Sequence, residues 1–183
     1  MSKPMSNLKL RQVADISYQM VINANITQPP VNVDKITQAC GVAIEQINIG
    51  EDVSGLLVIH GENAVIAVNP NQGSERKRFT IAHELGHFVL HRDFEKDTVF
   101  VDRDFIVKYR SNRIYSEIEL KQEQEANAFA ASLLMPKEFL FEELNKENMR
   151  NLSESALIAE LASVFEVSIP AMTFRLTNLN VLY

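Results

Sequence analysis

Three residues near the middle of the chain have the types and spacing of a catalytic metal site. His83, Glu84 and His87 form the pattern H-E-x-x-H within R-F-T-I-A-H-E-L-G-H-F-V-L-H, residues 78–91. Residues four apart lie on one face of an α-helix, so both imidazoles can direct a nitrogen to a single Zn²⁺ ion. Glu84 is offset by one position and can reach a water molecule at that ion without binding the ion. The pattern therefore predicts zinc-assisted hydrolysis of a peptide bond, with Glu84 as the base.

A catalytic zinc ion needs a third protein ligand, and a second segment offers carboxylates for it. Residues 123–136 read E-Q-E-A-N-A-F-A-A-S-L-L-M-P, and their apolar stripe predicts a helix on which Glu123 and Asn127 share one face. Glu125 lies about 160° away from Asn127 around that helix. If Asn127 hydrogen-bonds to the metal-binding helix, Glu123 is the better ligand, and Glu125 is either solvated or supports a ligand. The sequence leaves Glu125 open as the alternative ligand.

His91 continues the four-residue series but suits the metal less well. It is eight residues from His83, which places it about 12 Å further along a helix axis. The Phe-Val-Leu sequence that follows His87 gives no reason for the helix to break. We expect His91 at the helix C-terminus, where a cationic or hydrogen-bonding side chain is favoured.

Other groups could bind the substrate or stabilise the oxyanion that forms during peptide hydrolysis. The candidate oxyanion donors are His60, Tyr109, Arg113 and Tyr115. Surface or packing roles are commoner for such side chains than catalytic ones. A substrate peptide could also add to an exposed strand edge at 55–60 or 64–68.

The elements that must position these residues follow from hydrophobic spacing and turn residues. Apolar residues at helical intervals, with flanking caps and breakers, predict helices over 7–23, 33–40, 74–90 and 117–135. Apolar and β-branched segments predict strands over 42–49, 55–61 and 64–68. We expect two or three of these strands to pair antiparallel, with a long polar excursion over 92–116 and shorter helices after Pro136.

These elements predict an α+β fold in which a small antiparallel sheet packs on the H-E-x-x-H helix and the glutamate-bearing helix closes the site. The length suits a single domain over 1–183. Its parts are N-terminal helices over 1–41, the sheet and metal-site core over 42–136, and a C-terminal helical part over 137–183.

Composition excludes several classes of protein. Cys40 is the only cysteine, so the chain has no internal disulfide and no multi-cysteine zinc site. No apolar run approaches the roughly 18 residues that cross a membrane, and the first residues lack a signal-peptide core, so we expect a cytoplasmic location. The net charge is −6, and Arg175 is the only basic residue in 151–183. We therefore expect no direct contact with nucleic acid and a packed C-terminal helix pair instead.

Together, the segments 78–91 and 123–136 resemble the ImmA/IrrE family of gluzincin-like metallopeptidases, and the resemblance covers about residues 40–180. The second segment matches as E-x-x-x-N-x-F-A-A-x-L-L-M-P. The resemblance implies Zn²⁺ as the cofactor, His83 and His87 as ligands, Glu84 as the base, and Glu123 as the third ligand.

The resemblance also implies a protein substrate. Members of the family often act on helix-turn-helix repressors of the Xre type, so we expect a repressor or antitoxin encoded nearby as the partner. The rival interpretation is a metal-containing protein without effective catalysis, such as a toxin–antitoxin component, that sequesters the repressor or antitoxin. The sequence gives no indication of the oligomeric state.

Overall fold

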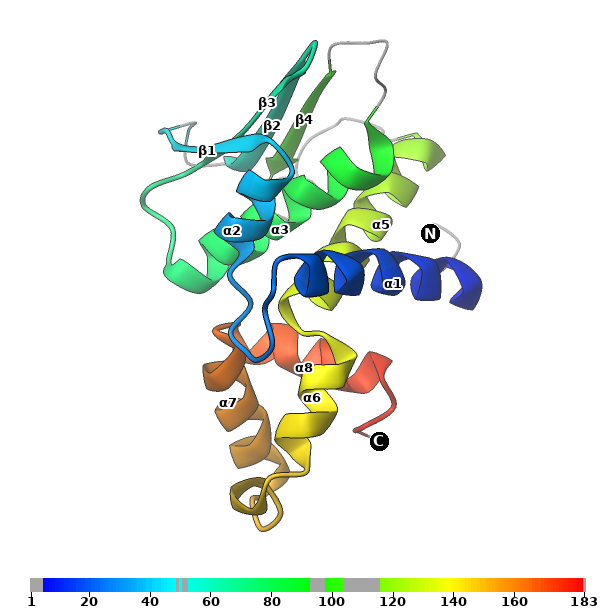
Figure 1. Ribbon diagram of the computed structural model, residues 1–183, viewed down its shortest axis with the longest axis vertical. Coiled ribbons are helices and arrows are strands. Elements are labelled where there is room, and N and C mark those ends of the chain that lie inside the picture. Colours follow the sequence, from blue (N-terminus) through cyan, green and yellow to red (C-terminus); the bar gives the residue numbers. More distant parts are fainter. Residues whose placement is uncertain (1–4, 49, 51–52, 93–97, 104–115, 183) are drawn as a thin grey trace.

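The computed structural model describes residues 5–48, 50, 53–92, 98–103 and 116–182. Within these ranges the chain forms helices at both ends and a four-stranded sheet in its middle (Figure 1). The elements in order are α1 (Asn7–Asn23), α2 (Val33–Ala39), β1 (Val42–Gln46), β2 (Val53–His60), β3 (Asn63–Val68), α3 (Ser74–His91), β4 (Thr98–Arg103), α5 (Glu117–Leu134), α6 (Lys137–Leu144), η1 (Glu147–Met149), α7 (Glu154–Phe165) and α8 (Ile169–Asn178). The predicted α+β class is confirmed, and the four predicted helices lie within one or two residues of the expected bounds.

The sheet has the order β1-β3-β2-β4 and is mixed. β2 runs antiparallel to β3 and β4, as expected, but β1 pairs parallel to β3, so the expectation of a wholly antiparallel sheet was wrong for this strand. The reason is that β3 folds back into the space between β1 and β2 instead of adding to the far side of β2. Both strands proposed for peptide addition, β2 and β3, are therefore internal, and the edges are β1 and β4.

The polar excursion contains a strand that the sequence did not predict. β4 lies within the 92–116 stretch and pairs with β2 from Thr98 opposite Ile59 to Arg103 opposite Val53. The segment T-V-F-V is rich in β-branched and aromatic residues, but it is short and lies between charged residues, so its strand signal is weak. The rest of the excursion, 93–97 and 104–115, lies outside the described residues.

α3 lies against one face of the sheet and is crossed on its other side by α5 (Figure 1). Every residue from Thr80 to His87 is buried, because this part of the helix is covered from both sides. The contact with the sheet depends on Gly55 in β2, since a Cβ atom there would lie 2.3 Å from Cγ2 of Thr80. The helix begins at Ser74, and Gly73 occupies its N-cap position.

α5 begins with a capping box and approaches α3 at a glycine. The Ser116 hydroxyl accepts from the backbone N–H of Glu119, and the Glu119 carboxylate accepts from the N–H of Ser116. Further along, a Cβ atom on Gly86 would lie 3.1 Å from Cδ1 of Phe129 and 3.2 Å from Cα of Ala126. Small residues at this crossing let the two helix backbones come close enough for their side chains to share one site.

The N-terminal helices cover the core from the remaining sides. α1 packs against α5, and α2 packs against β1 and α3 (Figure 1). Val21, Val31 and Ile36 from this part of the chain are buried in the same hydrophobic core as Leu57 and Ile66 of the sheet. The helices α1 and α2 therefore share one core with the sheet.

The C-terminal helices form the part of the molecule furthest from the sheet (Figure 1). Leu161, Phe165, Met172 and Leu176 are buried between α7 and α8, as the expected helix pair requires. Arg175 donates to the Met135 carbonyl and to the Ser132 hydroxyl, and burial lowers the pKa of Arg175 to about 10. Arg175, the only basic residue in 151–183, thus joins α8 to the end of α5.

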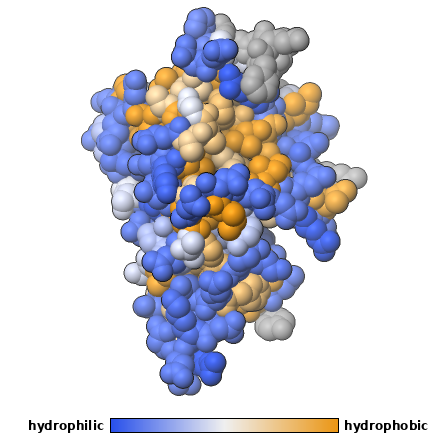
Figure 2. Space-filling view, viewed as in Figure 1, coloured by the Kyte–Doolittle hydropathy of each residue, from blue (hydrophilic) through white to orange (hydrophobic). Residues whose placement is uncertain are grey.

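The surface differs between the two ends of the molecule. Figure 2 shows a mostly hydrophilic face over α6 and α7, whereas the larger hydrophobic areas lie between the sheet and α1.

Among the described residues, no single helix combines the length and apolar composition needed to cross a membrane. The pair α7 and α8 passes that test only when joined, and its two helices are bent by 106°.

Candidate metal centre

Nitrogen atoms of two histidines and the carboxylate of one glutamate converge between α3 and α5. Nε2 of His87 lies 3.1 Å from Nε2 of His83. The Glu123 carboxylate approaches both rings, with Oε1 3.4 Å from Nε2 of His87 and Oε2 3.8 Å from Nε2 of His83. Both histidines are buried, while the Glu123 side chain is 22% exposed, so the cluster is reached from the side of Glu123.

The three side chains fit a zinc ion. Two atoms that each lie 2.0–2.1 Å from a tetrahedral zinc ion are about 3.3 Å apart, close to the separations within this cluster. Two imidazoles and one carboxylate are also a known donor set of catalytic zinc sites, which keep a fourth position open. Within the part of the chain that the structure describes, this is the one group of three or more potential ligands found to converge.

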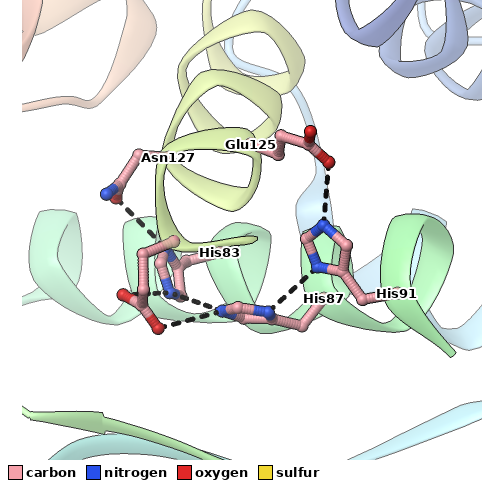
Figure 3. A network of polar contacts seen from close by, with 6 residues as sticks. His83, His87, His91, Glu125 and Asn127 are labelled. Carbon is pink, nitrogen blue, oxygen red and sulfur yellow. Dashed lines mark hydrogen bonds and ion pairs between the residues drawn. The ribbon is translucent and has the colours of Figure 1, made fainter. Parts of the chain in front are cut away.

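The ring of His83 is held by α5. Its Nδ1 lies 3.1 Å from Oδ1 of Asn127, which accepts a hydrogen bond when that nitrogen carries the proton (Figure 3). The preference for Glu123 over Glu125 as the third ligand depended on this contact. With Asn127 facing α3, the Glu123 carboxylate lies beside Nε2 of both histidines. The Glu125 carboxylate contacts His91 instead.

The ring of His87 is held by a longer chain of contacts (Figure 3). Its Nδ1 lies 3.2 Å from Nδ1 of His91, and Nε2 of His91 lies 3.0 Å from Oε2 of Glu125. The ammonium group of Lys9, on α1, is 3.4 Å from the same carboxylate oxygen. His91 is the last residue of α3, as expected, but its ring is buried in this chain of contacts and does not simply face the helix end.

Burial and nearby charges set the protonation states of His91 and Glu125. Burial lowers the pKa of His91, and the hydrogen bond with Glu125 offsets only part of that effect, so the imidazole is neutral near pH 7. Burial alone raises the pKa of Glu125, but the hydrogen bond with His91 and the charge of Lys9 outweigh it and hold the pKa below its ordinary value. A neutral imidazole therefore faces an ionised carboxylate.

Glu84 is fully buried between α3 and the sheet. Its Oε1 would lie 3.2 Å from a Cβ atom on Gly55, so a side chain at that position of β2 would displace the carboxylate as well as Thr80. The neighbouring position, His83, contributes its ring to the cluster. The helix thus carries a ligand candidate and a base candidate side by side, with a glycine of the sheet making room for the base.

Aromatic rings line the cluster. Phe100 of β4 stacks on the ring of His87, with 4.6 Å between ring centroids and 22° between the planes. Phe79 lies one turn before His83, with 6.3 Å between their centroids. Phe100 was not predicted as a site residue. The β-branched and aromatic residues of T-V-F-V were the one signal that could have placed it on a strand.

Of the four candidate oxyanion donors, His60 alone lies within the described residues. His60 is exposed at the end of β2. Tyr109, Arg113 and Tyr115 lie outside the described residues. Their proposed role therefore stays a prediction.

Comparisons with known proteins agree with this architecture. A relative, the radiation response metalloprotease IrrE of Deinococcus radiodurans, is 33% identical over 117 residues, which cover 64% of this chain and 32% of that protein. A solved structure of a Mycobacterium tuberculosis transcriptional regulator superposes with a TM-score of 0.60 at 15% identity, over 91% of this chain and 47% of the other, and so shows the fold alone. The chain spans about a third of the curated relative's length and under half of the solved one.

A family model matches most of the chain. The model is that of peptidase family M78, described as the IrrE N-terminal-like domain, and it aligns with residues 37–177. The match includes β1 through α8 and therefore both helices that contribute to the cluster. The chain thus belongs to the family of IrrE N-terminal-like peptidases.

Proposed function

We propose that this protein is a zinc-dependent endopeptidase that hydrolyses a peptide bond in a protein partner. The observation that carries the proposal is the convergence of His83, His87 and Glu123. Glu84, which follows His83 in α3, is fully buried on the same helix. Family membership supports a metalloprotease in general terms, and the Deinococcus relative is named as one. The identity of the metal rests on the donor set, which suits zinc.

Each residue has a distinct role in this proposal. His83, His87 and Glu123 hold the ion, which when bound supplies a Lewis acid for a peptide carbonyl and acidifies a water molecule. Glu84 accepts a proton from the attacking water at its carboxylate and later delivers a proton to the leaving amine. Phe100 covers one face of the His87 ring and limits the access of solvent to that ligand.

For the substrate, we propose a helix-turn-helix repressor of the Xre type, or an antitoxin encoded alongside. Support comes from the resemblance of 78–91 and 123–136 to the ImmA/IrrE pattern. The cluster opens on the side of Glu123, which is the most exposed of its three members. A segment of the partner would have to enter from that side.

The test is the Glu84→Gln variant. The amide keeps the size of the carboxylate but cannot accept a proton, so the rate of cleavage should fall about 10²–10⁴-fold while zinc content stays at one ion per chain. Cleavage of the adjacently encoded repressor is followed by mass spectrometry, and zinc by elemental analysis of the same samples. A variant that keeps both its zinc and the wild-type cleavage rate would contradict the role of Glu84.

The same variant separates catalysis from sequestration of the repressor. If Glu84→Gln still relieves repression in cells as the wild type does, the metal-containing binding protein is the correct interpretation. If relief of repression is lost together with cleavage, the peptidase is the correct interpretation. His83→Ala serves as the matched control, because it should lose zinc and cleavage together.

A further inference from the structure

The two histidines of the cluster are supported in different ways, and the support of His87 has no assigned role. Nδ1 of His83 lies beside the amide oxygen of Asn127, whereas Nδ1 of His87 lies beside a second histidine that in turn contacts a buried carboxylate. We infer that His91 and Glu125 are positioning residues that fix the tautomer and the ring orientation of His87. This inference rests on the proposed function, because it concerns how His87 is prepared to hold the metal.

The positions of the protons follow from the distances. A ring nitrogen binds a metal only when it carries no proton, so Nδ1 of His87 must carry the proton if Nε2 faces the ion. That Nδ1–H then donates to Nδ1 of His91 over 3.2 Å. Nδ1 of His91 must accept, which leaves the proton of His91 on Nε2, where it donates to Oε2 of Glu125 over 3.0 Å.

The carboxylate gives this chain of hydrogen bonds a single direction. The reverse order would place a proton on Nε2 of His87 and prevent it from binding metal, and it would require a protonated Glu125 as the first donor. Lys9 lies 3.4 Å from Oε2 and Lys121 lies 4.0 Å from Oε1, and both charges favour the ionised form. A carboxylate paired with these two charges accepts hydrogen bonds, which agrees with the order that a metal at Nε2 of His87 requires.

The hydrogen bond between His91 and Glu125 is shielded from solvent. The side chains of His91 and Glu125 are each only 6% exposed, so water competes little for their hydrogen bonds. Burying such a pair contributes little stability compared with apolar side chains of similar size. The α3–α5 crossing uses small and aromatic residues elsewhere, namely Gly86, Ala126 and Phe129. The polar contact of His91 with Glu125 is explained by what it does for His87.

The experiment compares zinc affinity across four variants. His91→Phe removes both hydrogen bonds, His91→Asn keeps an acceptor near the position of Nδ1, and Glu125→Met removes the acceptor with little change in size. Glu160→Met, at an exposed position of α7, is the matched control. Dissociation constants are measured by competition with a chromophoric chelator, and unfolding midpoints are measured on metal-free protein.

We expect zinc to bind about 10–100-fold more weakly in His91→Phe and Glu125→Met. His91→Asn should recover part of the loss, and Glu160→Met should match the wild type. In zinc-loaded protein with ¹⁵N-labelled histidine, the Nδ1 proton of His87 should be protected from solvent exchange in the wild type and His91→Asn but not in His91→Phe. A merely structural role would lower the unfolding midpoint without changing that proton or the zinc affinity.

The outcomes separate this inference from the proposed function. If the wild type binds no zinc, both fail. If the wild type binds zinc and His83→Ala does not, but His91→Phe and Glu125→Met bind zinc as the wild type does, only the positioning role fails. Glu125→Met alone decides the question if His91→Phe does not fold.

Discussion

Two helix pairs in this molecule bury side chains of opposite character. Between α3 and α5 lie His83, His87 and Glu125, three ionisable groups that lose hydration when they are buried. Between α7 and α8 lie Leu161 and Phe165 with the apolar side chains of the facing helix. Apolar burial stabilises a fold, whereas buried ionisable groups contribute little to stability and need partners. The first pair is therefore organised around a site and the second around a core.

The largest expected effect falls on the first pair. His87→Ala removes one of three ligand candidates, so zinc should bind at least about 10³-fold more weakly, since only two protein ligands remain. Elemental analysis after dialysis checks zinc content, and melting of the metal-free protein checks the fold. Stoichiometric zinc in this variant would contradict the assignment of the site. The α3–α5 pair would then have no more claim to a metal site than the α7–α8 pair.

An equivalent truncation in the second pair should change a different quantity. Leu161 is fully buried, and Leu161→Ala should lower the free energy of unfolding by about 2–5 kcal/mol through lost burial and a residual cavity. Zinc affinity of the folded protein should stay within a few-fold of the wild type, because α7 contributes no residue to the cluster. Chemical denaturation and chelator competition measure the two quantities. Loss of zinc binding at a temperature where the variant is folded would show that the pairs are coupled.

A substitution at the crossing of α3 and α5 should affect both quantities. A Cβ atom on Gly86 already meets the backbone of Ala126 at 3.2 Å, so Gly86→Val must displace α5. We expect a loss of about 1–3 kcal/mol in unfolding free energy from overpacking, together with weaker zinc binding, because Glu123 moves with its helix. The matched control is Ala162→Val in α7, which is also buried. Ala162→Val should lower the unfolding free energy without changing zinc affinity. An equal loss of zinc affinity in Gly86→Val and Ala162→Val would show that the two helix pairs do not differ in their effect on the site.

The sequence predicted those features that depend on one helix at a time. The shared faces of His83 with His87, and of Glu123 with Asn127, follow from the pitch of a helix and need no knowledge of the fold. The ranking of Glu123 over Glu125 required one assumption about the neighbouring helix, the Asn127 contact, and the structure contains that contact.

Apart from the meeting of Glu123 with the two histidines, several features that depend on two distant segments were not predicted. Contact of His91 with Glu125 joins residues 34 apart in sequence and depends on the crossing of α3 and α5. The stacking of Phe100 on His87 requires β4 to pair with β2, and the parallel pairing of β1 requires β3 to insert between two strands. Hydrophobic spacing reports which face of an element is buried, but it does not report which other element covers that face.

The smallest expected effect tests whether the two helix pairs differ at their ends. Ser116 caps α5 and Ser153 caps α7, each by accepting from the backbone N–H three residues later. Replacing either serine with alanine should lower the unfolding free energy by about 1 kcal/mol, because one N–H group at the helix start loses its partner. Ser116→Ala also breaks the capping box with Glu119, so its effect should be the larger of the two.

Ser116→Ala and Ser153→Ala should differ only slightly in their affinity for zinc. Fraying of α5 is confined to its first turn, and Glu123 lies seven residues after Ser116, almost two turns into the helix. Ser116→Ala should therefore weaken zinc binding by less than about threefold, and Ser153→Ala should leave it unchanged. A tenfold loss in Ser116→Ala would mean that the start of α5 folds only when the metal is bound. The glutamate helix would then be part of a site completed by its ligand, whereas α7 and α8 would remain folded without it.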